Sequence, residues 1–163
     1  MEDIVLDETA RTWEGLLMTH KGKVVNRPQA NFIASNKISQ LCYARGYANG
    51  ISIPKTLLTN NPNELREFYK KHAKLCHKLQ KSALVKRGDG DYLITYTNMV
   101  GSDNMEHADL VTRHPNLFQE YIEKEYELRI TALETGVIGI AIHSQDSEQS
   151  KVDFRRYDFE NVL

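Results

Sequence analysis

The sequence has few cysteines, no long apolar run and no excess of charge of one sign. Its two cysteines, Cys42 and Cys76, form no C-x-x-C pair and have no histidine at zinc-site spacing, so we expect two buried free thiols. No apolar run reaches the length of a secretory core or a membrane span, and the N-terminus is acidic, which favours a cytoplasmic protein. The 21 basic and 22 acidic residues are interspersed, so no large field would attract nucleic acid or a membrane.

The sequence also lacks the common patterns of metal and nucleophile sites. Its six histidines are scattered, and Asp103, Glu106 and Asp109 lack the loop pattern of a calcium hand. Ser144 and Ser147 have no histidine and aspartate arranged for nucleophilic catalysis. We therefore expect no metal ligands and no catalytic serine in this chain.

The first half of the sequence has the apolar spacing of helices. With 163 residues and 40% hydrophobic content, the chain can form one domain or two small lobes. Helices are predicted over residues 7–20 and from Pro28 to about Gly46, the second with Lys37 in its first half or middle. A strand is predicted over residues 56–59, followed by a helix that begins at Asn61 with an asparagine cap and a proline.

The second half is rich in β-branched and aromatic residues at alternating positions. A helical turn is expected at 106–110, and strands are expected at 74–79, 83–85, 92–100, 116–122, 125–133 and 137–143. Residues 134–136 join the last two strands as a hairpin. Helices followed by an antiparallel, β-rich half indicate an α+β fold.

The segment from residue 118 to residue 131 alternates charged and apolar positions most strictly. Glu127 and Arg129 are on one face of the expected strand, and Leu128 and Ile130 are on the other, which we expect to be buried. Such a charged face is most often only solvated. However, Glu120 and Glu127 are separated by an expected tight reversal at residues 123–124, which could present backbone to a flat heterocycle and a carboxylate to a sugar diol.

These segments resemble the ATP-grasp ribosomal peptide maturases, the microviridin-type ligases or graspetide synthetases. The pieces that carry the resemblance extend, in order, over residues 36–41, 53–60, 118–122, 127–129, 143–147 and 152–158. Each piece is weak alone, but their order and spacing over roughly residues 25–158 are specific.

The resemblance implies an incomplete ATP-grasp fold and an ATP-dependent ligase. Residues 1–24 would be a remnant of the preceding region, 54–115 a first lobe and 116–163 the start of a second lobe, within a partial ATP-grasp domain over 25–163. The family phosphorylates a peptide side-chain carboxylate with ATP and Mg²⁺, and a hydroxyl or amine attacks the acyl phosphate to form a lactone or lactam. The implied partners are ATP and a precursor peptide.

The resemblance also assigns nucleotide contacts to individual residues. Lys37 and Lys78 would bind phosphate, with Lys81 as the alternative to Lys78, although most lysines are simply solvated. Glu120 would lie near the adenine amino group, with the backbone of Tyr121 and Ile122 along the adenine edge. Glu127 would accept from the ribose hydroxyls, because a carboxylate can accept from both at once.

Two arginines are expected to act on the transferring phosphoryl group. Arg129 shares a strand face with Glu127, and Arg155 is favoured over Arg156 because an expected strand at 152–154 lets only one face the site. The family's magnesium ligands follow this segment, and the sequence ends at Leu163 without them. The Mg²⁺ ligands are therefore expected outside this chain.

Three functions of different class remain open. The chain could be part of a peptide ligase, a nucleotide-binding or regulatory module without turnover, or an interaction domain that binds a leader peptide on a strand edge. The sequence leaves open the precursor peptide, the choice of ester or amide, and the oligomeric state, with which a homodimer is compatible.

Overall fold

The computed structural model describes residues 2–47, 50–72, 74–80, 84–86, 88 and 90–157. It divides into two compact units, Met1–Ile53 and Pro54–Leu163. No helix among the described residues is long and apolar enough to cross a bilayer.

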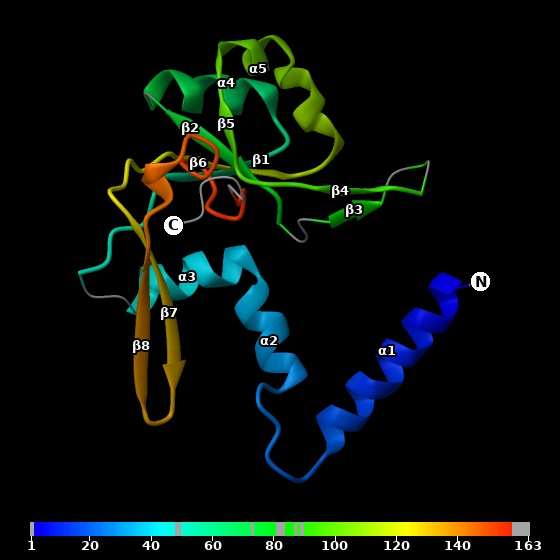
Figure 1. Cartoon of the computed structure of the whole chain (residues 1–163). Helices are drawn as coiled ribbons and strands as arrows, with labels where there is room; N and C mark the ends of the chain where they lie inside the picture. The colour runs from blue at the N-terminus through cyan, green and yellow to red at the C-terminus, as the bar shows by residue number, and fades with distance from the viewer. Residues whose placement is uncertain are drawn as a thin grey trace. The chain divides into compact units, whose positions relative to one another are not determined.

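The first unit consists of three helices, α1 (Glu2–Thr19), α2 (Pro28–Ser35) and α3 (Lys37–Tyr47) (Figure 1). The helix predicted over residues 7–20 is confirmed and begins earlier. The single helix predicted after Pro28 is wrong, because the chain is extended at Asn36 and the Oδ1 of Asn36 accepts from the Ser39 N–H at 3.0 Å. Asparagine at this position caps a new helix, so Lys37 is the first residue of α3. The predicted burial of Cys42 is also wrong, because its side chain is exposed.

The second unit is built on a four-stranded antiparallel sheet with the strand order β1-β6-β2-β5. Two separate ribbons pair β3 with β4 and β7 with β8. The strands are β1 (Thr56–Thr59), β2 (Leu75–Lys78), β3 (Leu84–Lys86), β4 (Tyr92–Ile94), β5 (Asn98–Val100), β6 (Asn116–Glu120), β7 (Glu127–Leu133) and β8 (Gly136–Ile142). Helices with antiparallel sheets confirm the predicted α+β class.

Helices cover one face of the four-stranded sheet, as Figure 1 shows for α4 and α5. The helical segments of this unit are α4 (Pro62–Lys71), α5 (Ser102–Glu106) and the 3-10 turns η1 (Ala108–Arg113) and η2 (Ser144–Asp146). The predicted start of α4 is confirmed, since the Oδ1 of Asn61 accepts from the Asn63 N–H at 2.9 Å. The core lies between these helices and the sheet and is formed by Leu65, Leu75, Val100, Ala108, Val111 and Phe118.

One strand prediction differs from the structure. The strand predicted over 92–100 is broken at 95–97, so that β4 and β5 belong to different sheets. The Thr97 N–H in this break donates to the Oδ2 of Asp153 at 2.8 Å instead of to a neighbouring strand. The helical turn predicted at 106–110 is confirmed, since it spans the end of α5 and the beginning of η1.

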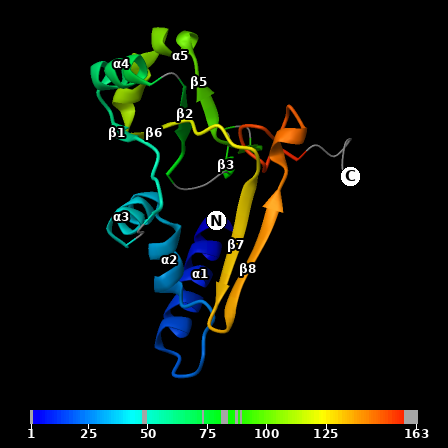
Figure 2. The same ribbon diagram turned by 90° about the vertical axis from the view of Figure 1, so that its left-hand side faces the viewer.

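The β7–β8 hairpin is confirmed, but its predicted buried face is wrong. Leu133 pairs with Gly136 across a two-residue turn. Figure 2 shows the two strands as a long separate ribbon. Leu128 is 59% exposed and Ile130 is 61% exposed, because β7 pairs only with β8 in the described part of the chain and no second layer covers either strand.

Candidate functional site

Strand β2 presents different side chains to the two faces of the sheet. Leu75 belongs to the helix-covered core, and by strand alternation His77 lies on the same face. Cys76 and Lys78 therefore lie on the opposite face. Burial raises the pKa of the Cys76 thiol, while the positive charges of Lys78 and Lys124 oppose that rise. The ammonium groups of Lys78 and Lys124 are thus both close enough to the Cys76 thiol to lower its pKa.

A carboxylate held in one orientation lies beside these cations. The Nζ of Lys124 is 2.7 Å from the Oε1 of Glu127, and the Ser144 hydroxyl donates to the same oxygen at 2.8 Å. Ser144 is only 2% exposed, and the Gln145 side-chain amide donates to its oxygen at 3.1 Å. No donor among the described residues reaches Oε2 of Glu127, so this oxygen can accept from a ligand.

The segment between β6 and β7 is anchored at several points. The Tyr121 N–H donates to the carbonyl of Lys74 at 2.9 Å, and the Tyr121 hydroxyl donates to the carbonyl of Lys151 at 3.3 Å. The tight reversal predicted at residues 123–124 is wrong, because β6 and β7 belong to different sheets and an irregular connection joins them. Since the Tyr121 N–H is engaged, the Tyr121 carbonyl and the Ile122 N–H are the edge groups that lack a backbone partner among the described residues.

Glu120 points away from the face that carries Lys78. It pairs with Leu75 in the β2–β6 register, which places its side chain on the helix-covered face. Its carboxylate accepts from the Lys55 N–H at 3.3 Å, and its own N–H donates to the Lys55 carbonyl at 2.9 Å. Any contribution of Glu120 to a site shared with Lys78 would therefore come from its backbone.

Asp153 is a buried carboxylate that holds Arg155. The Nε and Nη2 of Arg155 donate to the two Asp153 oxygens at 2.8 and 2.5 Å. Burial alone would raise the pKa of Asp153, but the hydrogen bonds from Arg155 and from the Thr97 N–H outweigh it and hold the pKa well below its usual range. This carboxylate therefore ties the C-terminal segment to the break between β4 and β5.

Both candidate arginines pack against one aromatic ring. The strand predicted at 152–154 is wrong, because these residues form turns. The guanidinium carbons of Arg155 and Arg156 lie 5.9 and 5.0 Å from the centre of the Tyr96 ring, so the expected alternation of the two side chains does not occur. Arg156 also donates to the Oδ1 of Asn98 at 2.7 Å.

The remaining predicted residues are not brought into this cluster by the described contacts. Arg129 pairs with Ile140 in the β7–β8 ladder, but its exposed side chain has no hydrogen-bond or ion-pair partner among the residues that the structure describes. Lys37 lies at the start of α3 in the other unit, where its side chain has an interaction of its own. Lys81, the alternative to Lys78, lies outside the described residues.

Sequence reasoning missed three residues that shape the site, namely Lys124, Ser144 and Asp153. Ser144 lies within one of the family-like segments, but it was considered only as a nucleophile. No group of three or more His, Cys, Asp or Glu side chains among the described residues could hold a metal ion. Glu127 is the one carboxylate of this cluster, and it is already paired with Lys124. The cluster around Glu127 therefore does not fit the Mg²⁺ that the resemblance implies, because Mg²⁺ needs several oxygen ligands.

Comparison with known proteins gives one consistent result. The chain matches a Chryseobacterium gregarium RiPP-associated ATP-grasp ligase, solved with ADP and a leader and core peptide, at 33% identity and a TM-score of 0.83 over 94% of this chain. It matches the macrocyclase MdnC of Microcystis aeruginosa MRC, solved with the precursor peptide MdnA, at 25% identity and a TM-score of 0.77 over 90% of this chain. The ATP-grasp ligase PsnB, at 20% identity and a TM-score of 0.64 over 85% of this chain, shares the fold. No family model and no curated protein matches.

The match covers only part of each solved relative. The aligned region is 45% of the Chryseobacterium ligase, 47% of MdnC and 44% of PsnB, so this chain spans less than half the length of these proteins. The match to the Chryseobacterium ligase nevertheless extends over 94% of this chain. Over nearly its whole length, this chain therefore has the fold of the matching part of the RiPP-associated ATP-grasp ligases.

Proposed function

We propose that this chain is the nucleotide-holding part of an ATP-dependent peptide ligase. In the proposed reaction, a side-chain carboxylate of a precursor peptide attacks the γ-phosphorus of ATP, and ADP leaves. A hydroxyl or amine of the same peptide then attacks the resulting acyl phosphate, phosphate leaves, and a lactone or lactam closes. The ADP and peptides present in the solved relatives support this class of reaction.

The orientation of Glu127 is the observation that carries the proposal. Both of its protein donors, Lys124 and Ser144, bind Oε1, which leaves Oε2 for an incoming donor. An ionised carboxylate accepts hydrogen bonds strongly, and one of its oxygens can accept from the two hydroxyls of a ribose. The Tyr121 carbonyl and the Ile122 N–H belong to one trans peptide group and point in opposite directions, so one of the two would face the adenine edge.

Cations would neutralise the phosphate groups as charge develops during transfer. Lys78 and Lys124 act on the same side of β2, as their common effect on the Cys76 thiol indicates. Arg155 uses two of its five N–H donors on Asp153, so it keeps donors for a phosphoryl oxygen while Asp153 fixes the plane of its guanidinium. Lys37 and Arg129 remain further proposed phosphate contacts.

A peptide-binding role without turnover is the second candidate, and the β7–β8 ribbon favours it. Each strand pairs only with the other among the described residues, so each has a free edge to which an extended peptide can add. The ribbon also exposes apolar side chains, including Ile138 at 56% and Ile140 at 60%. A leader peptide is the proposed occupant.

Calorimetric titration of the full chain with MgADP tests the nucleotide site. We expect Glu127→Gln to weaken binding by about 1–3 kcal/mol, because it removes a charged acceptor. Glu123→Gln is the matched control, since Glu123 is exposed and pairs only with Lys74 on the surface. Equal affinity of Glu127→Gln and the unmodified chain would remove the ribose assignment.

Turnover separates the two candidate functions. Release of phosphate that depends on a precursor peptide would support the ligase. Binding of the leader peptide without any ATP-dependent phosphate release would support the peptide-binding module instead.

A further inference from the structure

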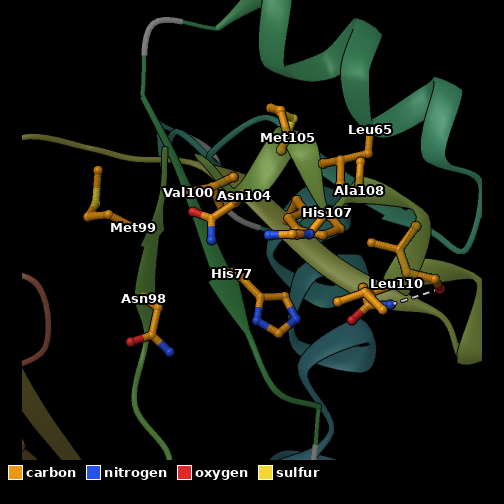
Figure 3. Close-up of a pocket in the computed structure, with 13 residues that line it drawn as sticks. Leu65, His77, Asn98, Met99, Val100, Asn104, Met105, His107, Ala108 and Leu110 are labelled. Atoms are coloured by element: carbon orange, nitrogen blue, oxygen red, sulfur yellow. Dashed lines mark hydrogen bonds between the residues drawn. The ribbon is translucent and has the colours of Figure 1, made fainter. Parts of the chain in front are cut away.

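The helix-covered side of the sheet contains a pocket of about 390 Å³ (Figure 3). Its floor is formed by core residues that include Leu65, Val100 and Phe118. His77 from β2 lines the pocket, whereas its neighbour Lys78 points to the opposite face of the same strand. The pocket is therefore separate from the cluster around Glu127.

The pocket has the anatomy of a small-molecule site. Sites for small ligands have volumes of about 300–1,000 Å³, a largely apolar lining and a few polar groups that fix orientation. The apolar side chain of Leu110, which belongs to the lining, is 60% exposed to water. A ligand in the pocket would cover it.

The charge of the lining restricts the ligand. All thirteen lining residues are apolar, asparagine or histidine, and none is Asp, Glu, Lys or Arg. Burial lowers the pKa of His77, and the nearby His114 lowers it further against a hydrogen bond with Asn116 that raises it. A neutral imidazole offers one donor and one acceptor. The nearest charge that the contacts show is Arg156, which lies outside the lining and donates to the Oδ1 of Asn98. Within the lining itself an ionised ligand would find no counter-charge, and burying an unpaired charge is costly.

The shape and polarisability of the lining favour a flat ring. The His77 ring already packs against Phe118 at 5.2 Å between centroids. Met105 contributes a thioether, which adapts its shape and contacts aromatic rings favourably. Figure 3 shows the rings of His77 and His107 on neighbouring sides of the pocket.

We propose that this pocket binds an uncharged aromatic or heteroaromatic small molecule. The ring of the ligand lies against the apolar floor, and its hydrogen-bonding edge meets the imidazoles of His77 and His107. Because β2 separates this pocket from Lys78, the small molecule and a nucleotide bind at the same time.

Titration of the full chain with indole and benzimidazole, followed by the methyl signals of methionine, tests this proposal. A saturable shift is expected at Met105, while Met18, in the other unit, serves as an internal reference. Benzoate and benzamidine, which carry opposite charges, are expected to bind at least about tenfold more weakly. Excess MgADP should leave the indole shifts unchanged.

Two variants make the site assignment specific. Leu110→Glu places a charge at the edge of the pocket and should weaken indole binding about tenfold or more, whereas Thr112→Glu, on the same 3-10 turn but outside the lining, should change it less than about twofold. His77→Phe keeps the ring contact with Phe118 and should weaken benzimidazole about tenfold, by loss of a hydrogen bond. Absence of a saturable shift at Met105, equal binding of charged probes, or displacement of indole by MgADP would each overturn the proposal.

Discussion

Replacing Asp153 with asparagine should destabilise the second unit by about 2–4 kcal/mol. The carboxylate is 5% exposed and accepts four hydrogen bonds, from the Thr97 N–H at 2.8 Å and from the N–H, Nε and Nη2 of Arg155 at 3.1, 2.8 and 2.5 Å. Asparagine keeps one acceptor oxygen and turns an NH₂ group toward the other donors. The side chain of Arg155 is 45% exposed and can be hydrated, so most of the loss comes from the buried part of the network.

The pH dependence of this loss has a definite sign. Because the folded-state pKa of Asp153 is lowered from the ordinary 3.8, its contribution is complete above that pH and is lost progressively as pH falls below it. Urea unfolding of the full chain should therefore show a constant difference between the unmodified chain and Asp153→Asn from pH 7 to about pH 5, and a shrinking difference below 3.8.

A matched control shows whether burial is the cause. Asp109 also pairs with an arginine, Arg66, but its side chain is 77% exposed. Asp109→Asn should therefore cost less than about 1 kcal/mol. If Asp153→Asn were no more destabilising than Asp109→Asn at pH 7, the assignment of Asp153 as a buried anchor would be refuted.

Three further predictions follow from the packing and the site. Leu65→Ala should destabilise the second unit by about 2–5 kcal/mol in urea unfolding, since Leu65 is 2% exposed at the centre of the core; the exposed Leu128→Ala should cost far less. Ser144→Ala should weaken MgADP binding about tenfold through loss of the hydrogen bond that orients Glu127, and an unchanged affinity in calorimetry would show that Lys124 alone orients the carboxylate. Lys78→Ala should weaken ADP more than adenosine, with the exposed Lys70→Ala as control; equal losses for both ligands would argue against a phosphate contact.

Local chemistry in the sequence was sufficient to predict several elements. The Asn61 cap and the proline after it fixed the start of α4, because their effects act within one helical turn. The same kind of signal was misread at Asn36, where an asparagine within an apolar helical pattern starts a new helix. Periodicity alone does not reveal such a cap, since the apolar spacing continues across it.

Features that depend on distant partners could not be predicted in this way. The break at Thr97 exists because its N–H donates to Asp153, a partner 56 positions away in the chain. The alternation in β7 predicted a buried face, but burial also requires a second layer, and the described residues provide none for this ribbon. Asp153 was likewise overlooked because its role depends on where the C-terminal segment folds back.

The charges around Glu127 indicate why a nucleotide would need more cations than this cluster contains. Lys124 is matched by Glu127 at 2.7 Å, which leaves Lys78 as the uncompensated charge on this side of β2. A di- or triphosphate carries several negative charges, and one ammonium cannot neutralise them as the phosphoryl group moves. Arg155 already shares its charge with Asp153, so it can offer directed donors but little net charge. The Arg129 side chain is exposed and has no ion-pair partner among the described residues, so its charge is one of those still available for the phosphate contact proposed above.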